Sequence, residues 1–104
     1  MSKFQELING EVPVLVDFHA EWCGPCKMMA PELKKLASIT GDSIKIIKVD
    51  VDQNQQASMA FQVNSVPTLI LFHKGKQIWR QSGALTANQL ISVIERNLNT
   101  QKTN

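Results

Sequence analysis

The sequence predicts an α/β domain built on a mixed sheet of about four strands, with helices on both faces of the sheet. Residues 13–18 are almost all apolar, which indicates a strand covered on both faces. A helical pattern at 25–40 and a β-branched run at 43–51 follow, and strands joined through a helix in this way are expected to be parallel. Two more strand patterns flank the sequence Lys-Gly-Lys at 74–76, which favours an antiparallel hairpin.

The long helix at 25–40 is expected to end at Gly41, a residue suited to a C-terminal cap. Pro31 lies inside the helical pattern and should kink the helix, because it lacks an N–H donor and clashes with the preceding turn. The apolar spacing predicts a buried face formed by Met29, Leu33, Leu36 and Ala37.

Shorter patterns complete the chain. The hairpin strands are expected at 68–73 and 77–81, and a capping-box pattern at 86–89 opens a last helix, after which 99–104 should be frayed. The apolar residues expected to face the core are Phe4, Leu7 and Ile8 in a first helix, Ala57, Ala60 and Phe61 in a helix at 54–61, and Leu90, Ile91, Ile94 and Leu98 in the last helix.

Composition limits the class of protein. A chain of 104 residues that is 43% hydrophobic predicts a single domain over residues 1–104. The formal charge is only +2 and no basic cluster occurs, which argues against a nucleic-acid partner. No apolar run approaches the roughly 20 residues of a membrane span, and the N-terminus resembles no signal peptide. We therefore expect a cytoplasmic protein with neither nucleic acid nor membrane as a partner.

The two cysteines of the chain, Cys23 and Cys26, lie at the start of the long helix. A thiol there meets unpaired N–H groups and the positive end of the helix dipole, which favour the nucleophilic thiolate. The second thiol lies one turn later on the same face. Inert structural cysteines are the alternative, but so short a loop would stabilise the fold little. The pattern therefore predicts reversible disulfide chemistry.

A zinc site is the other use that a Cys-x-x-Cys pair could have. His19 and His73 are the only other soft ligands, and their spacing matches no common zinc pattern. We therefore expect no metal.

A family resemblance covers most of the chain, from about Phe4 to Leu98. Residues 16–27, Val-Asp-Phe-His-Ala-Glu-Trp-Cys-Gly-Pro-Cys-Lys, closely resemble the active-site segment of the thioredoxin family. The resemblance implies a thioredoxin-like three-layer fold and a thiol–disulfide oxidoreductase that reduces protein disulfides, with no cofactor besides a redox-active Cys23–Cys26 disulfide. Three further segments are similar to the family's second parallel strand, its cis-proline loop and its late glycine turn, namely Val49-Asp50-Val51-Asp52, Val66-Pro67-Thr68 and Gly83-Ala84.

The resemblance also implies catalytic roles. Cys23 would be the more exposed, attacking thiol, and Cys26 would resolve the mixed disulfide; a buried Cys23 would count against this interpretation. Asp17 interrupts an apolar strand, which predicts a desolvated carboxyl group with a raised pKa. By resemblance it relays a proton to and from Cys26, and Lys48 matches the lysine that the family places nearby. The alternatives are an aspartate that faces solvent and an ordinary surface lysine.

A substrate surface follows from the same resemblance. Pro67 is expected to be cis and to leave the Val66 backbone free to pair with an extended substrate segment. Trp22 could instead be plain core packing, but its place beside the nucleophile favours the surface. The expected contact patch consists of Trp22, Gly24, Pro25, Val66, Pro67, Gly83 and Ala84.

The sequence departs from the family in two places. The family usually has an additional first strand, without which the strand at 44–51 is an open edge. We expect weak self-association through this edge or an N-terminal segment folded over it. His19 stands where the family commonly has an aromatic residue; it is either a polar filler or a charge that shifts the titration of the cysteines.

The predicted function is that of a protein-disulfide reductase recharged by a thioredoxin reductase. An oxidant or isomerase of the same fold is an alternative, as is a non-catalytic binding module whose thiols switch its shape. The sequence Gly-Pro between the cysteines and the absence of a leader favour the reductase.

Overall fold

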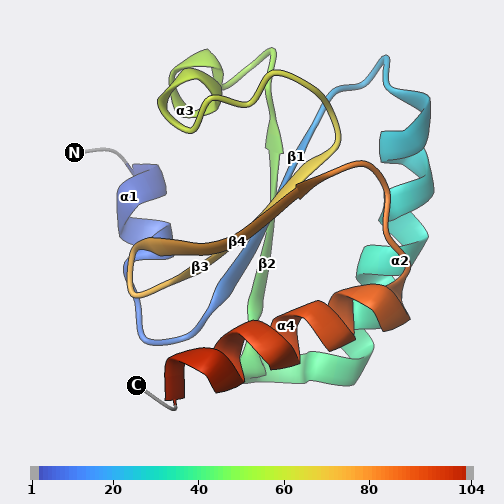
Figure 1. Cartoon of the computed structure of the whole chain (residues 1–104). Coiled ribbons are helices and arrows are strands. Elements are labelled where there is room, and N and C mark those ends of the chain that lie inside the picture. The colour runs from blue at the N-terminus through green and yellow to red at the C-terminus, as the bar shows by residue number, and fades with distance from the viewer. Residues whose placement is uncertain (1–2, 103–104) are drawn as a thin grey trace.

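The predicted mixed sheet is present in the computed structural model, which describes residues 3–102 (Figure 1). In chain order the elements are α1 (Lys3–Ile8), β1 (Val14–His19), α2 (Gly24–Thr40), the 3-10 helix η1 (Gly41–Ser43), β2 (Lys45–Asp50), α3 (Gln55–Ala60), β3 (Thr68–His73), β4 (Lys76–Ser82) and α4 (Ala87–Lys102).

The four strands are ordered β2-β1-β3-β4. β1 is parallel to β2, while β3 is antiparallel to both β1 and β4, so the predicted strand directions are confirmed. β1 is therefore a central strand, and its residues Val14 to Phe18 are all buried. β2 is an edge strand, and no other strand among residues 3–102 pairs with its free side.

The hairpin turn consists of Lys74 and Gly75. Their φ angles of 55° and 81° are both positive, as the twist of a two-residue hairpin loop requires. The Gly75 N–H donates a hydrogen bond of 3.0 Å to the Ile8 carbonyl oxygen, which joins the end of α1 to this turn.

Helices cover both faces of the sheet, as predicted. In Figure 1, α1 and α3 lie on one side and α2 and α4 on the other. Alternate residues of β1 separate the two cores, with Leu15 facing α2 and α4 and Phe18 facing α1 and α3. On the face covered by α1 and α3, Phe4 of α1 packs against three rings, those of Phe18, Phe61 and Phe72.

Several expected details of the helices are correct. Gly41 has a φ of 55° and donates its N–H to the Ala37 carbonyl oxygen, as a C-terminal cap does. The capping box is also confirmed, since the Thr86 N–H bonds Gln89 Oε1 at 2.9 Å and the Gln89 N–H bonds Thr86 Oγ1 at 3.2 Å.

Three apolar residues that we expected in the core are exposed. Ala37 faces solvent because the buried face of α2 follows Cys26, Met29, Leu33 and Leu36, which leaves the next position outside. Ala60 is exposed, and Ser58 takes the buried place on α3, where its hydroxyl donates to the Asn54 carbonyl oxygen at 3.1 Å. Leu7 is 39% exposed.

The C-terminal helix is longer than predicted. α4 continues beyond Leu98 to Lys102, whereas we expected fraying from residue 99; residues 103–104 lie outside the described residues. The Thr100 hydroxyl donates to the Arg96 carbonyl oxygen at 2.9 Å, a local bond that supports the added turn.

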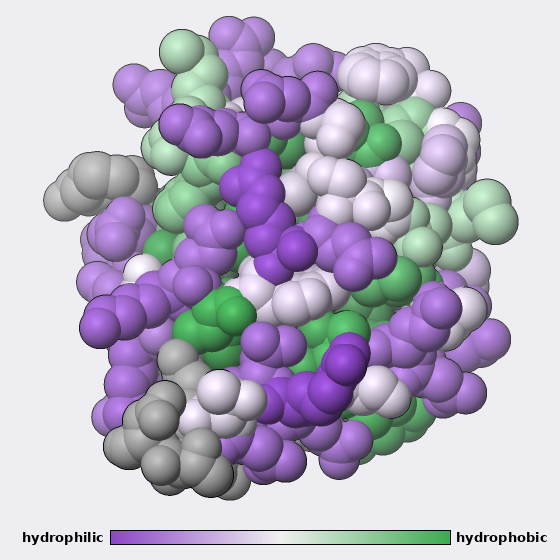
Figure 2. All heavy atoms as spheres, viewed as in Figure 1, coloured by the Kyte–Doolittle hydropathy of each residue, from purple (hydrophilic) through white to green (hydrophobic). Residues whose placement is uncertain are grey.

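The surface is mixed in character. Figure 2 shows a face covered mostly by hydrophilic residues, with hydrophobic residues between them in separate patches. Within residues 3–102, the helices are all too short or too polar to cross a lipid bilayer.

Candidate functional site

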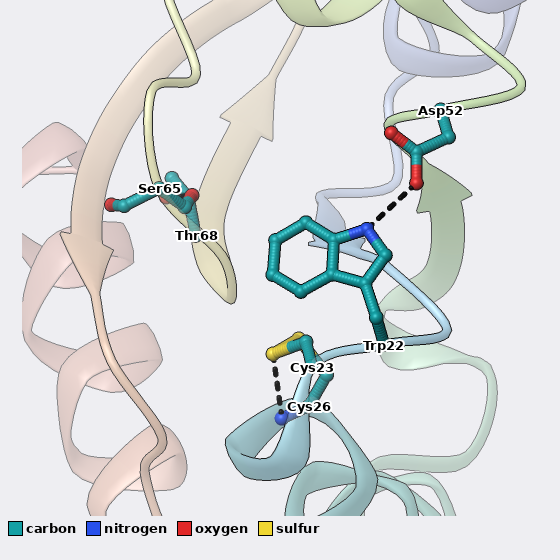
Figure 3. Close-up of a disulfide and its surroundings, with 6 residues drawn as sticks. All are labelled: Trp22, Cys23, Cys26, Asp52, Ser65 and Thr68. Atoms are coloured by element: carbon teal, nitrogen blue, oxygen red, sulfur yellow. Dashed lines mark hydrogen bonds between the residues drawn. A yellow bond between two sulfur atoms is a disulfide. The ribbon is translucent and has the colours of Figure 1, made fainter.

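The two cysteines form a disulfide at the N-terminus of α2, with their Cα atoms 5.3 Å apart. Cys23 is the N-cap residue, in an extended conformation with φ −90° and ψ 114°. Its sulfur accepts a hydrogen bond of 3.1 Å from the Cys26 N–H, one of the four N–H groups that a helix start leaves without an internal partner (Figure 3). The sequence predicted that a helix begins here, and the start of this helix directs the Cys26 N–H toward the Cys23 sulfur.

One expectation about the cysteines is wrong. Cys23 is not the more exposed of the two: it is 4% exposed and Cys26 is 7% exposed. Both belong to a small cluster with Ala20, against which Val51 and Val66 pack. As the N-cap residue, Cys23 directs its side chain back over the first helical turn. The argument from exposure therefore fails, and what remains for Cys23 is its position at the helix start.

Asp17 is fully buried, as its place in an apolar strand predicted. Neither carboxyl oxygen has a hydrogen-bond partner among the residues that the structure describes. Burial raises the pKa of the Asp17 carboxyl group above its ordinary value, while the nearby His19 and then Lys48 act in the opposite direction. The alternative of a solvent-facing aspartate is excluded, and the group is suited to holding a proton.

Lys48 lies directly opposite Asp17 in the register of β1 and β2. Neighbouring residues of parallel strands point to the same face, so both side chains are on the side of α2. Lys48 itself is exposed. It lines a shallow depression of about 430 Å³ together with His19, Ala20, Glu21, Cys26, Lys27 and Ala30.

Trp22 is a surface residue, 70% exposed, so core packing is the wrong interpretation of this ring. Its indole Nε1–H donates to Asp52 Oδ2 at 2.9 Å, and Figure 3 shows the ring extending from the segment before the disulfide toward Asp52. Sequence reasoning missed this role of Asp52. The residues are 30 positions apart, and only the family pattern drew attention to the segment that contains Asp52.

The Val66–Pro67 peptide bond is cis, as the resemblance implied. The Pro67 carbonyl oxygen accepts a 2.9 Å hydrogen bond from the N–H of Gly83, whose φ is 99°. This bond brings the glycine turn to the proline loop, and Val66 packs against the cysteine cluster. Gly24, Pro25 and Ala84 are exposed.

Two contacts that the sequence did not indicate connect α2 to the first residue of α4 and to the segment just before it. Glu32 Oε1 accepts the Ala87 N–H at 2.8 Å, and the Met29 sulfur accepts the Leu85 N–H at 3.3 Å. The partners are 55 and 56 residues apart, beyond the reach of any local pattern. They position the chain that follows Gly83 relative to the disulfide helix.

Within residues 3–102, no three His, Cys, Asp or Glu side chains lie together in a way that could hold a metal ion.

Comparison with known proteins gives a consistent result. The family model Thioredoxin matches residues 1–96. A thioredoxin of Haemophilus influenzae is 44% identical over 92 residues, which are 88% of this chain and 86% of that protein. Thioredoxin Y, chloroplastic, of Oryza sativa is 44% identical over 102 residues; the match covers 97% of this chain but only 61% of the rice protein.

Solved structures agree. The structure described under "Structural insights into thioredoxin-2: a component of malaria parasite protein secretion machinery" has a TM-score of 0.79 and 33% identity, covering 82% of each chain. These matches and the Cys23–Cys26 disulfide support the predicted dithiol–disulfide oxidoreductase.

Proposed function

Because the chain belongs to the thioredoxin family, we propose that it reduces disulfides of protein substrates through Cys23 and Cys26. The observation that carries this proposal is the placement of the Cys23 sulfur at the start of α2, where the Cys26 N–H bonds it. An N–H donor and the positive end of the helix dipole favour the thiolate of the reduced protein.

The reaction has two exchange steps. In the first, the Cys23 thiolate attacks one sulfur of the substrate disulfide, and the other substrate sulfur leaves as a thiolate. In the second, Cys26 loses its proton and attacks the Cys23 sulfur, which releases the second substrate thiolate. The substrate gains two electrons, its two thiolates take up protons from water, and the protein is left with the Cys23–Cys26 disulfide.

Asp17 and Lys48 serve the second step in this proposal. The raised pKa of Asp17 suits a carboxylate that takes up the proton of Cys26 and returns it in the reverse direction. The Lys48 charge, placed opposite in the register, limits that rise so that the carboxyl group can still ionise.

The proposed substrate surface surrounds the disulfide. Its supporting observations are the exposure of Trp22, the cis Val66–Pro67 bond and the hydrogen bond between Pro67 and Gly83. A substrate segment would lie over the exposed Gly24 and Pro25 on one side of the disulfide and against Val66 and Ala84 on the other. Exposed apolar residues beside a reactive group are typical of partner sites.

We propose that a thioredoxin reductase returns electrons to the disulfide and that the protein works in the cytoplasm. The Haemophilus relative supports a bacterial setting of this kind, whereas the rice relative carries a chloroplast name. Measurement of the reduction potential distinguishes a reductase from an oxidant or isomerase, because a reductase has the more negative potential.

The decisive experiment is substrate trapping. A Cys26→Ser variant should retain mixed disulfides on Cys23, whereas a matched Cys23→Ser variant should retain far fewer, because the attacking sulfur is gone. Reduction of insulin in the presence of dithiothreitol should require both cysteines. A binding module without catalysis would bind partners but fail to accelerate insulin reduction.

The free edge of β2 supports a proposal about assembly. α1 packs on a face of the sheet through Phe4, and no strand among residues 3–102 covers this edge. Lys45 and Lys48 are exposed on it and repel a second copy, so we propose a monomer that associates at most weakly. Sedimentation over a range of concentrations checks this, and a tight dimer would contradict it.

A further inference from the structure

His19 is the last residue of β1, and its position distinguishes it from a simple packing residue. It is two residues from Asp17, so alternation along the strand puts both side chains on the face that α2 covers. His19 is half-buried, whereas Asp17 is fully buried. Along this face of the strand, Asp17 therefore lies in the interior and His19 lies closer to the surface.

The depression beside α2 joins His19 to the resolving cysteine. Both residues line it, and so does Lys48, the register partner of Asp17. The proposed second exchange step requires the Cys26 thiol to lose a proton. Asp17 can take up this proton, but its carboxyl oxygens are fully buried and lack a hydrogen-bond partner within residues 3–102. Cys26 itself lines the depression, so a group there that both accepts and releases protons offers a second route beside Asp17.

The charged groups around His19 leave few candidates for this second route. They are Asp17 on its own strand, Lys48 on β2, Asp50 on β2, which is the register partner of His19, Glu21 in the loop that follows β1, and Lys27 on α2. Near neutral pH an ammonium group has no free electron pair for a proton, and an exposed carboxylate holds one only weakly. Imidazole both accepts and releases protons in this range.

We propose that His19 is a proton-transfer residue, which accepts the proton that Cys26 releases during resolution and passes it to solvent through the depression. The inference rests on the proposed function. The neutral imidazole of His19 takes up the proton through solvent in the depression, and the electron pair left on Cys26 forms the bond to the Cys23 sulfur. The substrate thiolate then leaves, and the imidazolium returns its proton to bulk water.

A stopped-flow experiment with the reduced protein tests the two steps separately. An aromatic disulfide whose two halves are coloured thiolates when released serves as the substrate. The first coloured thiolate appears when Cys23 attacks, and the second appears when Cys26 resolves the mixed disulfide. The rate of the second phase is measured as a function of pH.

In the wild-type protein, the second phase should accelerate as the pH rises, because only the neutral imidazole can accept a proton. In His19→Gln that phase should slow by about tenfold at the upper end of the pH range, less than the 10²–10⁴-fold of a sole acid–base group because Asp17 remains. The first phase should change little, and added imidazole should restore the second phase of a His19→Ala variant.

Two control variants separate proton transfer from other effects. His73→Gln removes the other histidine, which lies at the opposite end of the sheet, and should behave as wild type. His19→Lys introduces a permanent positive charge but cannot accept a proton near neutral pH, so it should be as slow as His19→Gln. Full activity of His19→Lys would assign His19 an electrostatic role and overturn the proposal.

The result that overturns the inference differs from the result that overturns the proposed function. If wild type releases both thiolates and His19→Gln shows the same rate and pH profile as His73→Gln, the reductase mechanism stands and His19 carries no proton. If wild type never releases the second thiolate, the two-step mechanism itself is wrong, and the inference falls with it.

Discussion

Asp17 and Lys48 are opposite each other in the register of two parallel strands, yet the Asp17 carboxyl oxygens accept no hydrogen bond from the described residues. Burial is the largest influence and raises the pKa of the carboxyl group, while His19 and then the Lys48 ammonium lower this pKa without overcoming the effect of burial. The interior thus holds an acid whose protonation depends in part on a charge at the surface.

Asp17→Asn should stabilise the oxidised protein at high pH. The pKa of Asp17 in the native state is raised above its ordinary value of 3.8. At pH values between the ordinary pKa and the raised pKa, the native state therefore binds more protons than the unfolded state. Wild-type stability therefore falls as the pH rises through this window. Urea unfolding at about pH 8 should show the variant more stable by about 1 kcal/mol or more, because an ionised carboxylate buried without a partner costs more than a neutral amide of the same shape.

The same comparison at low pH is the control for this prediction. Below the ordinary pKa, Asp17 is protonated in both states, so the advantage of the variant should disappear. A variant that is less stable than wild type at high pH would show that the carboxylate has stabilising contacts.

Lys48→Met should raise the pKa of Asp17 further, because it removes one of the two charges that lower it. Lys48→Arg keeps the charge and should leave the titration close to that of wild type. The measurement is an NMR titration of the Asp17 carboxyl carbon in the oxidised protein. A similar titration for the Met and Arg variants would show that the ammonium group is screened from Asp17 by solvent.

Trp22→Ala should weaken substrate binding more than it affects folding, because the side chain is 70% exposed. We expect KM for a protein disulfide to rise by about fivefold or more, as for a residue that contributes over 1 kcal/mol to an interface. The melting temperature should change little. Ile39→Ala is the matched control: Ile39 is 59% exposed near the far end of α2 and should alter neither KM nor kcat.

Glu32→Gln should reduce the sensitivity of the protein to acid. The Ala87 N–H bond is the main cause that lowers the pKa of Glu32 below its ordinary 4.5, with smaller help from Lys35. The charged carboxylate of Glu32 therefore stabilises the fold at pH values above 4.5, and this contribution is lost as the pH falls through the lowered pKa.

Melting temperatures measured between neutral and strongly acidic pH check the Glu32 prediction. They should fall further for wild type than for Glu32→Gln, whereas Glu95→Gln, on the exposed side of α4, should follow wild type. Equal losses for the two variants would mean that Glu32 contributes only through its neutral hydrogen bond.

The parts of the fold that local chemistry determines could be predicted. The position of Asp17 inside an apolar strand predicted its burial, and the structure decided against the solvent-facing alternative; the strand–helix–strand unit predicted that β1 and β2 are parallel. The turn at Lys74 and Gly75 followed from glycine in a short loop between strand patterns. Each of these depends on neighbours in sequence or on one crossover rule.

The rest depends on packing between distant segments. The sequence has no signal for the bonds of Glu32 to Ala87 or of Trp22 to Asp52, because only the tertiary arrangement brings them together. The exposure of Cys23 was predicted wrongly for the same reason: Val66, from the proline loop, packs over the cysteine cluster. Ala37 shows the limit of arguments from apolar periodicity, because the predicted buried face of α2 included one residue that the structure leaves exposed.

The hydrogen bond from the Cys26 N–H to the Cys23 sulfur has a consequence for how electrons are stored. A thiolate is a stronger acceptor than a disulfide sulfur, so the donor that serves the oxidised form is already in place for the reduced one. Reduction and reoxidation then change the charge on the Cys23 sulfur without calling for a new backbone donor at the start of α2. The same peptide group serves the sulfur in both redox forms, so the exchange needs no rebuilding of the first helical turn.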